Sequence, residues 1–366
     1  MKLECVKDKL KTAISKVDKI TGKNLTLPIL SCILFEAKNN TLTLKATNLD
    51  IGIEITVPAK IEEEGIVAVP GITFSNFLSN LYTEKNIILE TKEGNLIVST
   101  QHNTTVIKTF PPEDFPSIPT VIPERSFTIT SRELTKSLKS VWYSAAISSM
   151  KPEISSVYLY TEEDSLVCVA TDSFRLAEKK IKNKKVRDFG SLLIPVKNIA
   201  EIIKVFEEAS AEIEVSVDKN QASFSAEGVY LVSRIIEGTF PDYRQILPKE
   251  SKTEVVLLKQ DLINALKLSN VFTDKFNQLA IHIDPKNKSL ILTTKNGDVG
   301  ENKHNIEASV SGESLDITFN YKYIADSFQS IDADSIVLKF NGANRPLTIS
   351  PVSDPSFIYL VMPMNR

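Results

Sequence analysis

The sequence predicts an α+β protein made of three similar domains, and two observations lead to this prediction. First, a seven-residue string that starts as a strand and ends in a polar turn occurs three times, beginning at Leu42, Leu166 and Leu290, with an offset of 124 residues each time. Second, each string follows another strand and a polar hairpin turn, at residues 38–40, 162–164 and 285–288. The period is far longer than that of a solenoid, so we expect a triplicated domain rather than a stacked array.

Each repeat is expected to hold two amphipathic helices against many strands, which makes an α+β domain. We expect a helix to come first, then strands, a second helix and closing strands. Thr130 and Glu133 form a capping box for the first helix of the second repeat. The second helices begin after Pro70, Pro195 and Asn320. The apolar residues at helical spacing are Val6, Leu10, Ile14 and Val17; Leu134, Leu138, Val141 and Trp142; Leu262, Ala265, Leu266 and Ser269; Phe74, Phe77, Leu78 and Leu81; Ile199, Ile202, Ile203 and Phe206; and Tyr323, Ile324 and Phe328.

A further landmark recurs near the ends of the first two repeats. Thr-Phe-Pro occurs at residues 109–111 and again at 239–241, an offset of 130, so the second repeat carries a short insertion. We expect an N-terminal domain over residues 1–122, a central domain over 123–250 and a C-terminal domain over 251–366.

Composition places the chain among ordinary cytoplasmic proteins. The 366 residues include 43 basic and 46 acidic side chains, a net charge of -3, so the chain as a whole is not a polybasic DNA-coating protein. No stretch approaches the 18 apolar residues of a membrane span, and the N-terminus has no secretory signal. The three cysteines are odd in number and widely spaced, which favours buried free thiols in a reducing compartment.

Motifs for catalysis and for cofactor binding are missing from the sequence. The three histidines have no metal-ligand spacing to a cysteine or to another histidine. The phosphate-binding loops GxGxxG and GxxxxGK[ST] and the nucleophile elbow GxSxG do not occur. We therefore expect no catalytic residue, no metal and no cofactor. The alternative is an enzyme with an unfamiliar site, which a deep polar pocket with converging, perturbed carboxylates would favour.

Positive charge is concentrated on the expected helices. The helix regions together carry a net charge of +6, which leaves -9 on the strands and loops. Lysines on any single helix are most simply solvated surface residues, but the segregation across the whole set favours a helical surface that faces a polyanion. No aromatic residues alternate with these lysines, so a sequence-independent contact to a nucleic-acid backbone fits better than base stacking.

The chain resembles the bacterial DNA polymerase III beta subunit family, the sliding clamps, over its whole length from Met1 to Arg366. The matching strings are Thr-Leu-Pro-Ile-Leu at 26–30, Ala-Thr-Asp at 170–172 before Arg175 and Leu176, Phe-Pro-Asp-Tyr-Arg at 240–244, and Val-Met-Pro-Met at 361–364. The resemblance implies the DNA clamp fold, with three similar domains, and a ring-shaped head-to-tail homodimer with helices lining the pore. It implies a non-catalytic processivity factor in the cytoplasm, at the nucleoid.

The resemblance also implies the partners. They are duplex DNA bound without sequence preference, a second copy of the chain, the replicative polymerase, the clamp loader, and other replication and repair proteins that carry a clamp-binding motif. No membrane is implied. The expected dimer joins the first domain near residues 74–81 and 101–108 to the third domain near 266–273 and 293–306.

A peptide-docking pocket between the second and third domains is implied as well. Methionine, leucine and proline side chains suit a short apolar anchor, and Arg175, Asn320 and Tyr323 could hold its backbone. The alternative is that Leu176, Ile246 and Val361 are plain core residues. The residues carried over to the pocket are Ile154, Thr171, Phe174, Arg175, Leu176, Pro241, Ile246, Asn320, Tyr323, Pro346, Val361, Met362, Pro363 and Met364.

Three positions depart from the family pattern. Phe174 stands where many members have a histidine, and Gln245 where some have a basic residue, so both could reshape the pocket. Asn24 stands where a pore arginine is common, and Lys23 could substitute for it. The residues expected to approach DNA are Lys23, Asn24, Lys136, Lys139, Lys151 and Lys197. A second alternative remains, a β-rich oligomer that binds protein and no nucleic acid.

Overall fold

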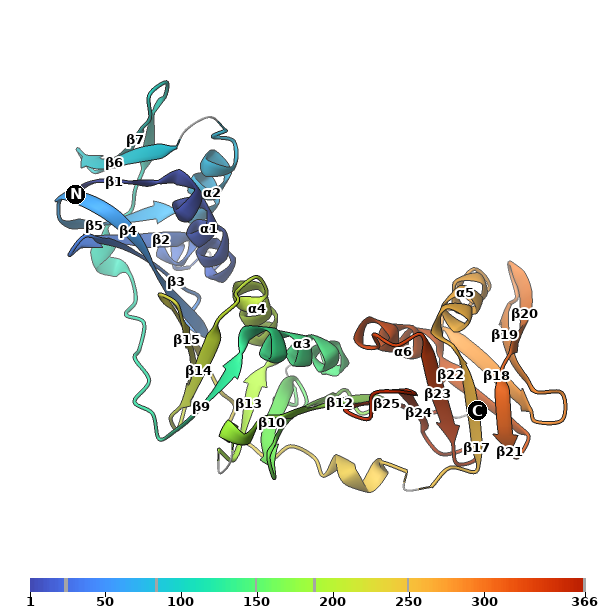
Figure 1. Cartoon of the computed structure of the whole chain (residues 1–366). Coiled ribbons are helices and arrows are strands. Elements are labelled where there is room, and N and C mark those ends of the chain that lie inside the picture. Colours follow the sequence, from blue (N-terminus) through green and yellow to red (C-terminus); the bar gives the residue numbers. More distant parts are fainter. Residues whose placement is uncertain (23–25, 83–84, 149, 187–188, 249, 365–366) are drawn as a thin grey trace. The chain divides into compact units, whose positions relative to one another are not determined.

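The structure is a computed structural model that describes residues 1–22, 26–82, 85–148, 150–186, 189–248 and 250–364 (Figure 1). Lys23 and Asn24 therefore lie outside the described residues. The first repeat consists of β1 (Lys2–Val6), α1 (Lys7–Val17), β2 (Cys32–Lys38), β3 (Thr41–Thr47), β4 (Ile51–Glu63), β5 (Gly65–Pro70), α2 (Gly71–Ser79), β6 (Asn86–Lys92), β7 (Asn95–Ser99) and β8 (Thr104–Lys108).

The second repeat follows the same order of elements, and the third differs by one additional strand, because β20 and β21 stand where the first repeat has the single strand β4. The second has β9 (Arg125–Thr130), α3 (Ser131–Val141), β10 (Ser156–Glu162), β11 (Ser165–Thr171), β12 (Arg175–Lys182), β13 (Ser191–Pro195), α4 (Val196–Phe206), β14 (Glu212–Val217), β15 (Gln221–Ala226) and β16 (Val229–Arg234). The third has β17 (Thr253–Leu258), α5 (Lys259–Asn270), β18 (Gln278–Asp284), β19 (Ser289–Asn296), β20 (Gly300–Glu307), β21 (Ser309–Gly312), β22 (Leu315–Asn320), α6 (Tyr321–Asp326), β23 (Ser335–Phe340), β24 (Leu347–Pro351) and β25 (Phe357–Val361).

The α+β prediction and the triplication are confirmed, but the prediction that a helix begins each repeat is wrong. A strand comes first each time, namely β1, β9 and β17. In β1, Leu3 and Cys5 point into the core with the period of two that a strand has, and Val6 ends the strand with 37% of its surface exposed. Val6 therefore does not belong to the apolar stripe of α1, which consists of Leu10, Ile14 and Val17 together with Ala13.

The helix ends follow from local side-chain chemistry. Thr130 and Glu133 interact as a capping pair at the start of α3, since the Thr130 Oγ1 accepts from the Glu133 N–H at 3.2 Å and donates to its carboxylate at 2.7 Å. Asn320 caps α6 by accepting from the Lys322 N–H. The three cysteines are free and buried, as expected.

The described chain forms two compact units, which divide the middle repeat between them. One consists of residues 1–135 and 197–235, and it contains a 12-stranded sheet in which β4 pairs with β16. The other consists of residues 136–196 and 236–366, and it contains a nine-stranded sheet in which β12 pairs with β25 and a four-stranded sheet β20-β19-β18-β22. Each repeat is thus joined to the next along the chain by an antiparallel strand pair inside one unit.

Candidate functional site

The pairing of β12 with β25 brings together three stretches of sequence that carry the expected pocket residues. Arg175 lies opposite Val361 and Leu176 opposite Leu360. Beyond β25 the tail continues the contact, because the Met362 N–H donates to the Phe174 carbonyl at 2.8 Å. Next, the Met364 N–H donates to the carbonyl of Thr318 in β22, also at 2.8 Å. Residues 171–176, 318–323 and 361–364 therefore form one surface within this unit.

The turn between β11 and β12 fixes the position of Arg175 and its neighbour. The Thr171 hydroxyl donates to the Arg175 carbonyl at 2.7 Å. One carboxylate oxygen of Asp172 accepts from the backbone N–H groups of Phe174 and Arg175, both at 2.9 Å. Ser173 has a φ of 78°, a left-handed value that a non-glycine residue adopts only when its surroundings hold it there. The backbone of this turn is thus specified by the side chains of Thr171 and Asp172.

The Arg175 guanidinium is held by three partners. Its Nε donates to Asp172 at 2.9 Å, its Nη2 donates to the Tyr143 carbonyl at 2.7 Å, and its Nη1 bonds the Asp326 carboxylate. The guanidinium carbon also lies 4.9 Å from the centre of the Tyr323 ring, a cation–π distance. The side chain is only 11% exposed. Three of its five N–H donors thus bind the protein itself, which limits what Arg175 could offer to a peptide backbone.

The remaining expected pocket residues differ in exposure. Leu176 and Val361 are fully buried, so the alternative that they are plain core residues agrees with this structure. Ile246, by contrast, is 44% exposed. Among the others, Phe174 and Pro241 are exposed; Asn320, Tyr323, Met362, Pro363 and Met364 are half-buried; and Ile154, Thr171 and Pro346 are buried. Asn320 uses its side-chain oxygen to cap α6, so it too has an intramolecular role.

The core beneath this surface connects the tail to the segment 240–247. Leu176 and Leu360 belong to a buried cluster with Phe240 and Tyr243, and Met362 packs against that cluster. Three phenylalanine and tyrosine rings, those of Tyr158, Tyr160 and Phe240, stack with centroids 4.9–5.0 Å apart. They line a cavity of about 340 Å³ together with Pro241 and Arg244.

A polar network under the segment 240–247 was not anticipated from the sequence. The buried Tyr243 hydroxyl donates to the Glu178 carboxylate and lies 2.7 Å from the Tyr160 hydroxyl. Burial, together with the hydrogen bond to Glu178, raises the pKa of Tyr243. Arg244 completes the network by donating to Tyr160 at 2.8 Å and bonding Glu162. The signal available in the sequence was the cluster Tyr-x-Tyr-x-Glu at 158–162, whose residues share one face of a strand.

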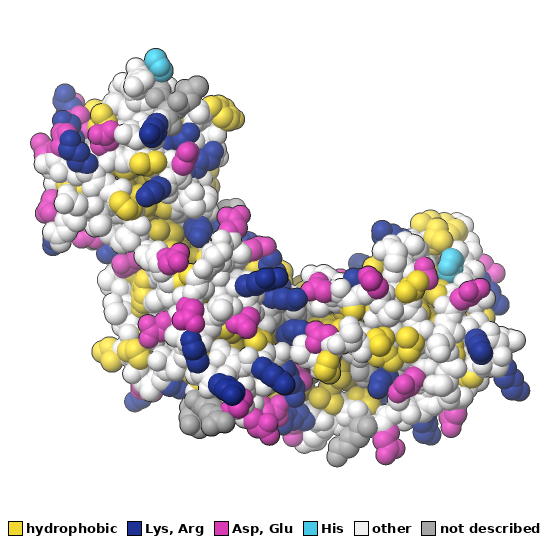
Figure 2. Space-filling view, in the orientation of Figure 1, with side chains coloured by type: hydrophobic (Ala, Val, Ile, Leu, Met, Phe, Trp, Pro, Cys, Tyr) yellow, Lys and Arg dark blue, Asp and Glu magenta, His cyan; other side chains and the backbone are white. Residues whose placement is uncertain are grey.

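The lysines expected to approach DNA are at the surface, but two of them are ion-paired. Lys136 on α3 lies 2.6 Å from Asp332, and Lys197 at the start of α4 bonds Asp50. Lys151 is exposed in the turn before β10, and Lys139 is half-buried. Figure 2 shows dark-blue side chains gathered over α3. Arg132, which was not chosen from the sequence, has the i, i+4, i+7 spacing with Lys136 and Lys139 that places all three on one face of that helix.

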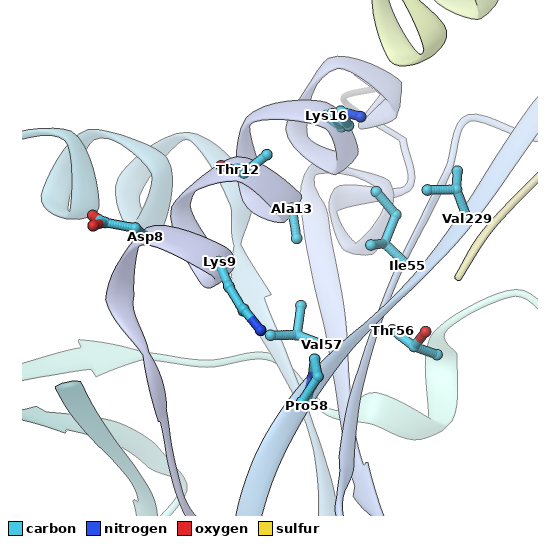
Figure 3. A pocket seen from close by; sticks show the side chains of 10 residues that line it. All are labelled: Asp8, Lys9, Thr12, Ala13, Lys16, Ile55, Thr56, Val57, Pro58 and Val229. Atoms are coloured by element: carbon cyan, nitrogen blue, oxygen red, sulfur yellow. The ribbon is translucent and has the colours of Figure 1, made fainter. Parts of the chain in front are cut away.

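Two grooves in the other unit bear on the enzyme alternative. The first has about 400 Å³ and lies between α1 and β4, with Ala13, Ile55 and Val57 as its apolar floor (Figure 3). Its lining has a single carboxylate, Asp8, which points away from the β4 side chains in Figure 3. The second, of about 530 Å³, is lined by four glutamates, Glu54, Glu212, Glu214 and Glu227. Across the described part of the chain, no cluster of His, Cys, Asp or Glu has the arrangement of a metal site.

No helix among the described residues is both long enough and apolar enough to cross a membrane.

Comparison with known proteins gives matches along the whole chain. Models of the three domains of the DNA polymerase III beta subunit match in order, the N-terminal domain at residues 1–119, the central domain at 128–242 and the C-terminal domain at 244–365. A beta sliding clamp from Synechococcus elongatus is 26% identical over 372 residues, covering 100% of this chain and 99% of its own. One from Staphylococcus aureus is 26% identical over 375 residues with the same coverage. The crystal structure of the DNA polymerase III beta subunit from Thermotoga maritima has a TM-score of 0.94 at 28% identity, covering 100% of this chain and 99% of its own.

Proposed function

The chain belongs to the DNA polymerase III beta subunit family, and from this premise we propose that it is a sliding clamp that encircles duplex DNA and tethers the replicative polymerase to it. The observation that carries the proposal is the match of all three domain models, in order, over the full chain. A ring held on DNA by topology needs no tight or sequence-specific contact, which agrees with a net charge of -3. In this proposal the chain has no active site of its own and acts in the cytoplasm, at the nucleoid.

The proposed domains keep the boundaries 1–122, 123–250 and 251–366. The proposed partners are duplex DNA, a second copy, the polymerase, the clamp loader and other proteins with a clamp-binding motif.

The basic face of α3 supports a contact to phosphates, since lysine and arginine bind the DNA backbone without reading sequence. We assign this contact to Lys136, Lys139, Lys151 and Lys197, with Arg132 added and with Lys23 and Asn24 outside the described residues. The ion pairs of Lys136 with Asp332 and of Lys197 with Asp50 would have to break when DNA binds.

Two of the edge strands among the described residues, β8 and β20, support the proposed dimer. In the order of elements, β8 corresponds to β16 and β25, and β20 corresponds to β4 and β12. Since β16 pairs with β4 and β25 pairs with β12, the same rule pairs β8 of one copy with β20 of another. Extending the registers of the two intrachain pairs places Thr105 opposite Asn302 of a second copy.

Exposed apolar side chains flank both of these edges. Val106 in β8 is 61% exposed, and Val271 just after α5 and Val299 just before β20 are exposed as well. Figure 2 shows a yellow patch at the end of α5. Apolar groups at a sheet edge favour burial against another copy. Once paired in the dimer, an edge strand can no longer pair with strands of other molecules and aggregate.

The dimer is tested by Val106→Asp, with Val352→Asp as the matched control, because Val352 has a similar exposure and follows β24, outside the strands β8 and β20. We expect sedimentation at micromolar concentration to give a dimer for the wild type and for the control. Val106→Asp should sediment as the 40.7 kDa monomer. A monomeric wild type would contradict the proposal.

The proposed function is tested by comparing how long the protein is retained on circular DNA and on the same DNA after it is cut. The clamp is loaded onto nicked circular DNA with its clamp loader and ATP, and the DNA is then cut once. We expect the protein to stay on the circle at high salt and to be lost after linearisation. Retention on linear DNA, or no ATP-dependent retention on the circle, would refute the sliding clamp and would favour a protein-binding oligomer.

A further inference from the structure

The groove between α1 and β4 combines an apolar floor with two lysines (Figure 3). Ala13, Ile55 and Val57 form the floor and are 3–6% exposed. Lys9 and Lys16 are lining residues seven positions apart on α1, so they lie on one face of the helix, two turns from each other. The volume of about 400 Å³ leaves room for an apolar side chain next to these cations.

The positive charge of this groove is not neutralised within its lining. The single carboxylate there, Asp8, is paired with Lys7 at 3.3 Å and points away from β4 (Figure 3). Among the residues that the structure describes, neither Lys9 nor Lys16 takes part in an ion pair. The groove therefore presents two cations to an anionic group.

Lys16 is the more enclosed of the two lysines. Burial lowers its pKa below the ordinary value, and the positive charge of Lys19 acts in the same direction. The carboxylates of Glu208 and Glu227 act in the opposite direction but do not restore the ordinary pKa. One more carboxylate beside Lys16 would therefore stabilise its charged form.

The strand position at this floor has an equivalent at the junction between the second and third repeats. Ile55 lies opposite Val229, the first residue of β16. Lys179 lies opposite Phe357, the first residue of β25. Because β4 and β12 are equivalent strands, as are β16 and β25, Ile55 and Lys179 hold the same place in their repeats.

The chain itself covers this place where the second repeat joins the third. Residues 352–356 connect β24 to β25, and within them Asp354 and Ser356 bind the Lys179 amine at 2.9 Å and 2.6 Å. The connection from β15 to β16 consists only of residues 227–228, so it has no counterpart of that loop, and the groove lies open there. The molecule thus shows which chemistry fits this place, namely a short segment that brings a carboxylate to a lysine.

The apolar floor distinguishes between two kinds of anionic partner. DNA phosphates would bind the lysine amines and leave Ile55 and Val57 uncovered, because contacts to the DNA backbone are polar. A peptide can place an aliphatic side chain on the floor and a carboxylate next to a lysine at the same time. The groove therefore fits a protein segment better than it fits a nucleic acid.

We propose that the groove between α1 and β4 is a further docking site, which binds a short acidic segment of a partner protein. An aliphatic side chain of that segment covers Ile55 and Val57, and a carboxylate next to it pairs with Lys9 or Lys16. The site shares no residue with the docking surface proposed above, so a partner held here leaves that surface available to another.

The test starts with a random heptapeptide display library. The library is first depleted on a full-length variant that carries Lys9→Gln, Thr12→Trp and Lys16→Gln, and it is then selected on the wild type. Thr12 is an exposed lining residue, so tryptophan there fills the groove without changing its charge. The depletion removes peptides that bind elsewhere on the chain. We expect the remaining peptides to share an aspartate or glutamate next to an aliphatic residue.

Fluorescence anisotropy with the selected peptides then separates the effect of charge from that of shape. Lys9→Gln and Lys16→Gln should each weaken binding about threefold. Thr12→Trp keeps both lysines and should weaken it about fivefold or more, because the aliphatic side chain loses its place. Lys11→Gln is the matched control, since Lys11 lies on α1 outside the lining and should leave the affinity unchanged. Thermal melting verifies that each variant is folded.

Four results would overturn the proposal. It is wrong if no acidic peptide remains after depletion, if Thr12→Trp binds the peptides as well as the wild type, or if Lys11→Gln weakens binding as much as Lys9→Gln. A short DNA duplex of random sequence provides the fourth. If Lys9→Gln and Lys16→Gln weaken its binding while no peptide is selected, the two lysines serve a DNA contact instead.

Discussion

The junction between the first and second repeats and the junction between the second and third share a backbone and differ in their side chains. In the first, residues 51–55 of β4 pair with residues 229–233 of β16, and in the second, residues 175–179 of β12 pair with residues 357–361 of β25. Each has five paired positions, but the interactions around them are unequal. The first junction is tied by Lys197 with Asp50 and by Asn198 with Ser233 at 2.9 Å.

The second junction has a denser set of charged contacts. Besides the three partners of Arg175, Lys179 binds both Asp354 at 2.9 Å and Ser356 at 2.6 Å. The comparison teaches that five paired strand positions with a few side-chain contacts are enough to join two repeats. The additional contacts at the second junction therefore serve the surface that is built on it, where Phe174 and the tail must be held in place.

The largest expected effect in this comparison is that of Arg175→Ala. The change leaves Asp172 and Asp326 without their cation and removes a nearly buried guanidinium, so we expect a loss of about 3 kcal/mol or more. Lys197→Ala at the first junction breaks an exposed pair and should cost less than about 1 kcal/mol. Urea denaturation measures both, and similar losses for the two variants would break the comparison.

Removal of residues 362–366 should have a smaller effect on stability and a large one on binding. The tail contributes two backbone hydrogen bonds and the packing of Met362, so a loss of about 1–2 kcal/mol is expected. Polymerase and loader binding should be lost, while the dimer persists in sedimentation. If the truncated protein unfolds instead, the tail is part of the core and the second junction depends on it.

Asp50→Asn tests whether Lys197, which lies at the first junction, contacts DNA. The change frees Lys197 from its carboxylate partner and removes one negative charge from the surface, so binding to DNA at low salt should tighten about twofold to threefold. Asp332→Asn is the matched change beside Lys136 and should act in the same direction. Filter binding over a salt series measures both, and unchanged affinity in both variants would argue against a DNA contact by these lysines.

The smallest expected effect is an acid-dependent loosening of the second junction. Burial alone would raise the pKa of Asp354, but hydrogen bonds from Ser356 and Lys179 outweigh it and hold the pKa at about 2. A depressed carboxyl pKa stabilises the fold above the unfolded value of about 3.9, and this contribution is lost as pH falls from about 4 toward 2. Asp354→Asn should flatten the fall in melting temperature over that range, and an unchanged profile would exclude the Asp354 contact as its cause.

The sequence predicted the repeat and most of the helices because both depend on local patterns. The 124-residue offset is borne out down to the hydrogen bonds of the turns at 47–51 and 171–175. The strands that begin the repeats were missed because β1 runs directly into α1, and Val6 extends the helical spacing although it ends a strand. The contacts of Arg175 with Asp326 and Tyr143 could not be predicted, because these two residues are distant in the sequence and meet Arg175 only through the fold.

The paired turns have a consequence for how such a chain diversifies after duplication of its domain. In each turn, a threonine and an Asn or Asp specify the backbone, so the turn itself does not depend on the side chain of the fourth residue. Asp50 and Phe174 are two outcomes of that freedom in a single molecule. The position is a ready place for a new recognition surface to arise by a single substitution, and a protein engineer could exchange these residues between the repeats without redesigning the loop.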